Sequence, residues 1–127
     1  MVWNRNVLLR LVLGATGIFF IVGLYPAAKL WPEAFGWSPP HPAFERMITA
    51  LYASLGLFLL LAARRPARYR PIIDFTIVSS LAHGLVMAVD AWREPANRLH
   101  LLTDIPALFA LAAVLLVLRP GAADPEP

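Results

Sequence analysis

Residues 72–92 read IIDFTIVSSLAHGLVMAVDAW, a run of 21 residues in which apolar side chains predominate. An α-helix rises about 1.5 Å per residue, so this run would be about 31 Å long, which matches the hydrocarbon core of a bilayer. Pro71 precedes the run and Trp92 ends it, as expected for a helix start and for an aromatic residue at a membrane surface. The stretch therefore predicts a membrane-spanning helix.

Three further stretches have the same character, at residues 7–25, 44–63 and 99–118. The 127-residue chain is 59% hydrophobic and 15% charged, whereas soluble domains are about half apolar and about a quarter charged. We therefore predict an all-α fold, in which residues 1–127 form a single domain of four transmembrane helices with up-down topology. We expect the proline- and aromatic-rich loop 26–43 to lie flat over one end of this bundle and the tail 122–127 to be disordered.

Pro106 leaves two possible starts for the fourth helix. A start near Asn97 would place this proline inside the helix and kink it beside Asp104. A start at Asp104 would leave only about 21 Å of helix before Leu118. Because that length is short for a span, we favour the earlier start with a kink.

The arginines predict the orientation of the bundle. Because successive spans alternate in direction, Arg5, Arg119 and the basic cluster at residues 64–70 fall on one side of the membrane. The positive-inside rule then places both termini and the 64–70 loop in the cytoplasm. Asp74 is expected to pair with an arginine of that loop. Charge concentrated in this way does not favour a nucleic-acid partner.

Polar residues inside the third span are candidates for function, because such residues are costly in lipid. Thr76, His83 and Asp90 recur every seven residues and therefore share one face of the helix, with Ser80 close to the same stripe. His83 is expected near the bilayer centre.

The second span carries a matching polar face. Glu45, Thr49 and Tyr52 share it with Gly56. Lipid contact would be expensive for both polar faces, so we predict that the second and third helices turn these faces toward each other in the bundle interior. Gly14 and Gly17 in the first span are small residues of the kind that lets helices approach closely.

Three carboxylates, those of Glu45, Asp90 and Asp104, fall on one side of the membrane by parity. We predict that they line one outward-opening cavity with His83 at its floor. The candidate residues for binding a ligand or a proton are Glu45, Thr49, Tyr52, Ser80, His83, Asp90 and Asp104.

Local structure offers an alternative explanation for each of these residues. Glu45 can pair with Lys29 or Arg46, and a carboxylate at a helix start can cap that helix. His83 can be a neutral histidine of the core, bonded to Ser79 or Ser80.

The pieces YASLGLFLLLAARRP (52–66), IIDFTIVSSLAHGLVMAVDAW (72–92) and HLLTDIPALFALAAVLLVL (100–118) resemble a bacterial family of small four-span membrane proteins of unknown function. In size and layout the chain is also loosely similar to DoxX-like proteins. The resemblance implies a four-helix protein of the bacterial inner membrane. His83-Gly84 and Asp104-Ile105-Pro106 match polar positions of that family, which implies no substrate.

Three functions compete at this stage. The first is a module that binds or translocates a small ligand or proton. The second is a non-catalytic accessory subunit, in a homo-oligomer or a larger membrane complex. The third is a membrane enzyme, which we place last because one histidine with three acids is a poor metal set and no catalytic motif is present. We expect no catalytic residue, metal or cofactor, and we place His41 and His100 in shallow loops, unsuited to pairing with His83.

Overall fold

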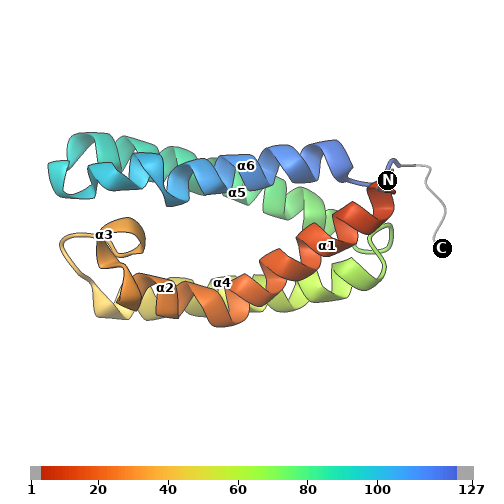
Figure 1. Cartoon of the computed structure of the whole chain (residues 1–127), viewed down its shortest axis with the longest axis horizontal. Coiled ribbons are helices and arrows are strands. Elements are labelled where there is room, and N and C mark those ends of the chain that lie inside the picture. Colours follow the sequence, from red (N-terminus) through yellow and green to blue (C-terminus); the bar gives the residue numbers. More distant parts are fainter. Residues whose placement is uncertain (1–3, 123–127) are drawn as a thin grey trace.

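The computed structural model describes residues 4–122 of the chain, so the predicted disorder of the tail, residues 123–127, lies outside the described range. Helices make up the described part, and no strand occurs in it (Figure 1). The helical elements are α1 (Arg5–Ile18), the π-helical turn η1 (Phe19–Gly23), α2 (Leu24–Leu30), α3 (Pro32–Phe35), α4 (Pro42–Arg64), α5 (Arg70–Arg93), the 3-10 helix η2 (Pro95–Leu102) and α6 (Asp104–Leu118).

Four continuous helical segments are long and apolar enough to cross a membrane: Arg5–Leu30, Pro42–Arg64, Arg70–Arg93 and Pro95–Leu118. The predicted all-α fold with four transmembrane helices is confirmed. Large apolar side chains are exposed on these segments; Val22, Val78 and Val117 are each exposed by 63% or more. A soluble monomer rarely exposes apolar surface on this scale, and a lipid environment accounts for it.

The first span extends to Leu30 although Pro26 lies inside it. A proline within an α-helix removes one backbone hydrogen bond and clashes with the carbonyl group four residues earlier. The π-helical turn η1 ends three residues before Pro26, and its wider backbone lets the helix continue past the proline. Residues 26–30, predicted as loop, are therefore helical.

The fourth span begins differently from the prediction. Residues 95–102 form the 3-10 helix η2, Thr103 breaks the helical backbone with φ −117° and ψ −99°, and α6 starts at Asp104. The kink expected at Pro106 is wrong, because this proline lies in the first turn of α6, where its missing N–H costs no helical bond. The short α6 still belongs to a full span because η2 adds roughly 16 Å.

The four spans form two antiparallel hairpins (Figure 1). The first hairpin consists of α1, η1 and α2 packed along α4, and the second consists of α5 packed along η2 and α6. We call the end with the chain termini and the 64–70 loop the terminal end. The opposite end is the capped end, because α3 and the loop after it lie there between the two hairpins. This segment, predicted to lie flat over the bundle, is folded inward.

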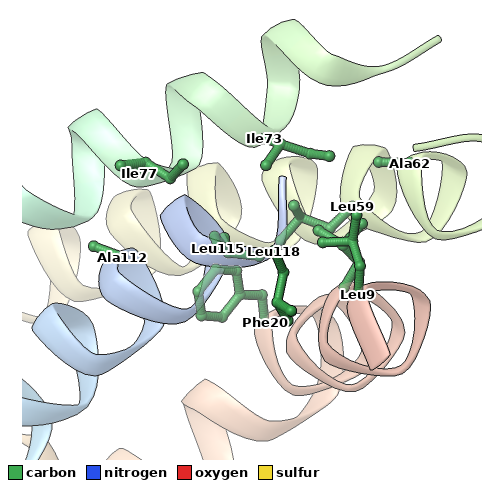
Figure 2. Packing of buried hydrophobic residues seen from close by; sticks show 10 residues of the cluster. Leu9, Phe20, Leu59, Ala62, Ile73, Ile77, Ala112, Leu115 and Leu118 are labelled. Atoms are coloured by element: carbon green, nitrogen blue, oxygen red, sulfur yellow. The ribbon is translucent and has the colours of Figure 1, made fainter. Parts of the chain in front are cut away.

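The apolar core joins the two hairpins in the terminal half of the bundle. Figure 2 shows side chains from α1, η1, α4, α5 and α6 packed together. Leu13, Leu59 and Leu115 are completely buried there. Burial of this kind stabilises the fold. Thr76 of α5 is buried beside this core, and its hydroxyl donates to the Ile72 carbonyl of the same helix.

A close backbone contact holds the first hairpin together. A Cβ added to Gly17 of α1 would lie 2.7 Å from the Gly56 carbonyl oxygen, and one added to Gly56 would lie 2.6 Å from that of Gly17. Only glycine fits at either position without a shift. Gly17 thus packs closely on α4, whereas a Cβ added to Gly14 would have no neighbour within 4 Å. A packing role for Gly14 stays a prediction.

Candidate functional site

One side-chain hydrogen bond joins the two hairpins in the interior of the bundle. The Tyr52 hydroxyl of α4 lies 3.0 Å from Nδ1 of His83 of α5. His83 is about 15 Å from the Arg93 end of α5 and about 20 Å from its Arg70 end, so it lies near mid-span. The prediction that the second and third helices turn polar faces toward each other is confirmed for these two residues. The partner of His83 is Tyr52 and neither Ser79 nor Ser80.

The aromatic residues around Tyr52 fix the position of its ring. The Phe20 ring of η1 meets the Tyr52 ring edge-on, with centroids 4.8 Å apart and an angle of 81° between planes. The rings of Tyr52 and His83 are also inclined, with centroids 5.6 Å apart. Such edge-to-face contacts are favourable and directional. The hydroxyl group is therefore held toward the imidazole.

The Tyr52–His83 bond is compatible with both charge states of the imidazole. A phenol can donate its O–H to an unprotonated Nδ1, and it can accept a hydrogen bond when Nδ1 carries a proton. His83 can thus gain or lose a proton while the bond to Tyr52 persists. Both side chains are half-buried, so the pair is not sealed from its surroundings.

The Asp104 carboxylate at the start of α6 completes the group. The field of its negative charge reaches both Tyr52 and His83, although it forms no hydrogen bond with either side chain. Its Oδ1 is 2.8 Å from Nδ1 of His100, and the Asp104 side chain is 17% exposed. We call Tyr52, His83 and Asp104 the midplane group, and it is drawn from both hairpins.

His100 of η2 is fully buried and both of its ring nitrogens have partners. Nε2 lies 2.8 Å from the Gly36 carbonyl oxygen, which can only accept, so Nε2 carries a proton and donates it. Nδ1 then either donates to an ionised Asp104 or accepts from a protonated one. His100 and Asp104 therefore share one proton. The Trp37 ring stacks on the imidazole, with centroids 4.3 Å apart and planes inclined by 15°.

Further hydrogen bonds fasten the inward-folded segment, residues 31–41, to the second hairpin. Asn97 accepts from the Ser38 N–H at 2.9 Å and donates to the Ser38 carbonyl at 2.7 Å. The Thr103 hydroxyl donates to the Ala34 carbonyl at 3.0 Å. Together with His100, these contacts define what we call the cap, which closes the capped end above the midplane group.

The remaining predicted site residues form no hydrogen bond with Tyr52, His83 or Asp104. Glu45 pairs with Lys29 at 3.3 Å, and the Thr49 hydroxyl donates to the Glu45 carbonyl within α4. Ser80 is buried on α5 with 4% exposure. Asp90 is exposed near the capped end, without an ion pair to any residue in the range 4–122. The structure thus brings Tyr52, His83 and Asp104 together. A role in binding for Glu45, Thr49, Ser80 and Asp90 stays a prediction.

Metal binding finds no support in the described range. Within residues 4–122 no three histidine, aspartate or glutamate side chains are close enough to hold an ion. The convergence of Glu45, Asp90 and Asp104 on one cavity with His83 at its floor stays a prediction.

Sequence reasoning placed His100 in a shallow loop, and this is wrong. The residue lies in η2 and is completely buried. One signal could have found it, since His100 and Asp104 are four residues apart, a spacing that brings side chains together on a helix. The bond to Gly36 spans 64 positions of the chain and has no signature in local spacing.

Comparison with known proteins places the chain in a family. Residues 4–124 match the model of a family described as "Family of unknown function (DUF6632)". The chain belongs to this family. The match agrees with the resemblance to an uncharacterised family and covers nearly the whole chain, whereas the bacterial origin and the likeness to DoxX-like proteins stay predictions. No curated protein and no solved structure matches the chain.

Proposed function

We propose that this small polytopic membrane protein binds a proton or small ligand at the midplane group, with access from the capped end. The observation that carries the proposal is the 3.0 Å hydrogen bond between Tyr52 and His83, which joins the two hairpins near mid-span. Ionisable residues at such depth are costly and are typical of ion pathways and proton relays. A proton is the ligand that these side chains favour, because imidazole, phenol and carboxylate groups all exchange protons.

The position of the midplane group favours entry from the capped end. The apolar core fills most of the terminal half of the bundle (Figure 2). The hydroxyl of the buried Thr76 in this half is already bonded to the Ile72 carbonyl of its own helix. Toward the capped end, Asp104 and His100 already share a proton across 2.8 Å. A proton on that pair can exchange with His83 from the Asp104 carboxylate by way of bridging water.

Proton binding can be tested by titrating the protein in detergent and counting the groups that change charge between about pH 5 and pH 8. His83→Gln should remove proton uptake that the wild type shows. Asp90→Asn and Glu45→Gln are the matched controls, since they alter acids outside the midplane group. Identical uptake by the wild type and His83→Gln would reject the proposal.

A role as an accessory subunit of a membrane complex is the second candidate. The observation in its favour is a shallow apolar depression on the second hairpin at the capped end, lined by Ala88, Val89, Trp92, Arg93 and Leu101. Trp92 is 72% exposed there, and aromatic residues are enriched at interfaces. In this case Trp92→Ala would release a partner that co-purifies in mild detergent, and His83→Gln would leave both partner and function unchanged.

A further inference from the structure

Charge is distributed unequally between the two ends of the bundle. Within residues 4–122 the terminal end carries seven arginines and one acid, Asp74, whereas the capped end carries four basic and five acidic residues. The basic residues of the terminal end are Arg5, Arg10, Arg64, Arg65, Arg68, Arg70 and Arg119. Such an excess requires either internal acceptors or an external anion.

Three of these arginines bind acceptors inside the protein. Nη1 of Arg119 donates to Asp74 at 2.7 Å, and Nε of Arg70 lies 3.6 Å from the same carboxylate, which confirms the predicted pairing of Asp74 with the loop. The Arg5 guanidinium donates to the carbonyl groups of Val117 and Arg119 at the end of α6. The only acid of this end within residues 4–122 is therefore already occupied.

Arg64, Arg65 and Arg68 have no such acceptor. All three are exposed, and none forms an ion pair or a side-chain hydrogen bond with any residue in the described range. They lie where α4 ends and shortly before α5 begins, which is the level of the lipid headgroups for two helices that cross a bilayer.

The loop that carries these arginines is fixed to the bundle. Pro66 is among the fully buried side chains, and the Tyr69 N–H donates to the Arg65 carbonyl at 3.2 Å. The Tyr69 ring packs against the apolar core. The backbone of the loop is therefore already ordered before the arginines bind an anion.

We propose that Arg64, Arg65 and Arg68 form a binding site for the headgroups of anionic phospholipids. A guanidinium group presents a planar set of N–H donors that matches a phosphate group, and it remains charged at all relevant pH values. Basic clusters directly beside a membrane span attract anionic lipids at roughly 1 kcal/mol, or about fivefold in affinity, for each arginine. A lipid fits better than a soluble anion because the site lies at the membrane surface on both flanking helices.

The test compares lipid retention by three forms of the whole protein. Each form is placed in nanodiscs of equal parts phosphatidylglycerol and phosphatidylcholine. The lipids that stay bound when the protein is released from the nanodisc are counted by native mass spectrometry. Wild type should retain phosphatidylglycerol preferentially. In the variant Arg64→Gln/Arg65→Gln/Arg68→Gln, the preference for phosphatidylglycerol should be at least about fivefold weaker than in the wild type.

The matched control removes the same charge at the capped end. Arg46, Arg93 and Arg98 are exposed arginines without an ion pair to any residue from 4 to 122, and their triple substitution by Gln should keep the preference within about twofold of wild type. Equal losses in both triple variants would show a net-charge effect and overturn the proposal, as would no loss in either. If the terminal-end variant fails to fold, the three single substitutions are compared in the same way.

Discussion

The hydroxyl of Tyr52 and Nδ1 of His83 lie 3.0 Å apart. This hydrogen bond joins the two hairpins near mid-span, between the apolar core and the cap. On the terminal side of this bond the hairpins are joined by apolar packing, and on the capped side by the inward-folded segment. The bond therefore contributes to the stability of the bundle and can persist whether or not Nδ1 of the imidazole carries a proton.

Tyr52→Phe removes the hydroxyl and keeps the ring that packs on Phe20. We expect a loss of about 1 kcal/mol in the free energy of unfolding, since His83 is left without its partner. Unfolding in mixed micelles monitored by circular dichroism measures the change. Tyr25→Phe is the control, because the Tyr25 ring is exposed and its hydroxyl bonds to no residue in the described part of the chain. Equal stability of all three proteins would show that the bond is not formed in the membrane.

His100→Leu should release the cap. The substitution removes the bond to Gly36, leaves Asp104 without its partner and abolishes the stacking of Trp37. We expect a destabilisation of about 2 kcal/mol and faster amide exchange in residues 33–38, measured by hydrogen–deuterium exchange. His41→Gln, at an exposed histidine near the same end, should leave the exchange unchanged. Unaltered protection in His100→Leu would mean that the cap is held by Asn97 and Thr103 alone.

Gly17→Ala and Gly14→Ala form a matched pair on α1. The new methyl group at position 17 would meet the Gly56 carbonyl oxygen at 2.7 Å, whereas at position 14 it would enter open space. Gly17→Ala should therefore destabilise the protein by about 1–3 kcal/mol. Gly14→Ala should be neutral or stabilising by up to about 1 kcal/mol, since alanine favours the helix. Similar unfolding curves for the two variants would contradict the close approach of α1 and α4.

Much of the fold follows from the sequence because long apolar runs have few alternatives. A stretch such as residues 72–92 can only be a membrane span, and the seven-residue spacing of polar groups was enough to turn His83 inward. Tyr52 was found in the same way. These inferences are strong for a membrane protein, because a polar side chain that faces lipid carries a large cost in free energy.

Features that depend on contacts between distant residues were missed. Pro26 was taken to end the first span, since spacing does not reveal a widened turn that accommodates a proline. The start of α6 was misplaced because Thr103 breaks the helix while bonding to Ala34, 69 positions away. His100 escaped for the same reason, and Gly56 was assigned to a polar face although it packs on Gly17.

The orientation of the bundle is predicted from the arginines of the terminal end. We expect this end to face the cytoplasm, and a bacterial inner membrane to be the location of the protein. Cysteine introduced by Ser38→Cys should react with an impermeant reagent from outside the cell, and Ala67→Cys only after permeabilisation. The opposite pattern would reverse the topology. Reaction of both residues from outside would contradict four spans.

The most direct test of the midplane group is a titration of His83 in lipid bilayers, followed through the ¹⁵N signals of its ring by solid-state NMR. The exposed His41 is replaced by Gln if its signals overlap. We predict that the His83 ring gains and loses a proton within the pH range over which the protein stays folded, and that Asp104→Asn shifts its midpoint while Asp90→Asn does not. An imidazole that stays in one state across this range, or a midpoint that is the same in Asp104→Asn as in the wild type, would contradict a proton-binding group built from Tyr52, His83 and Asp104.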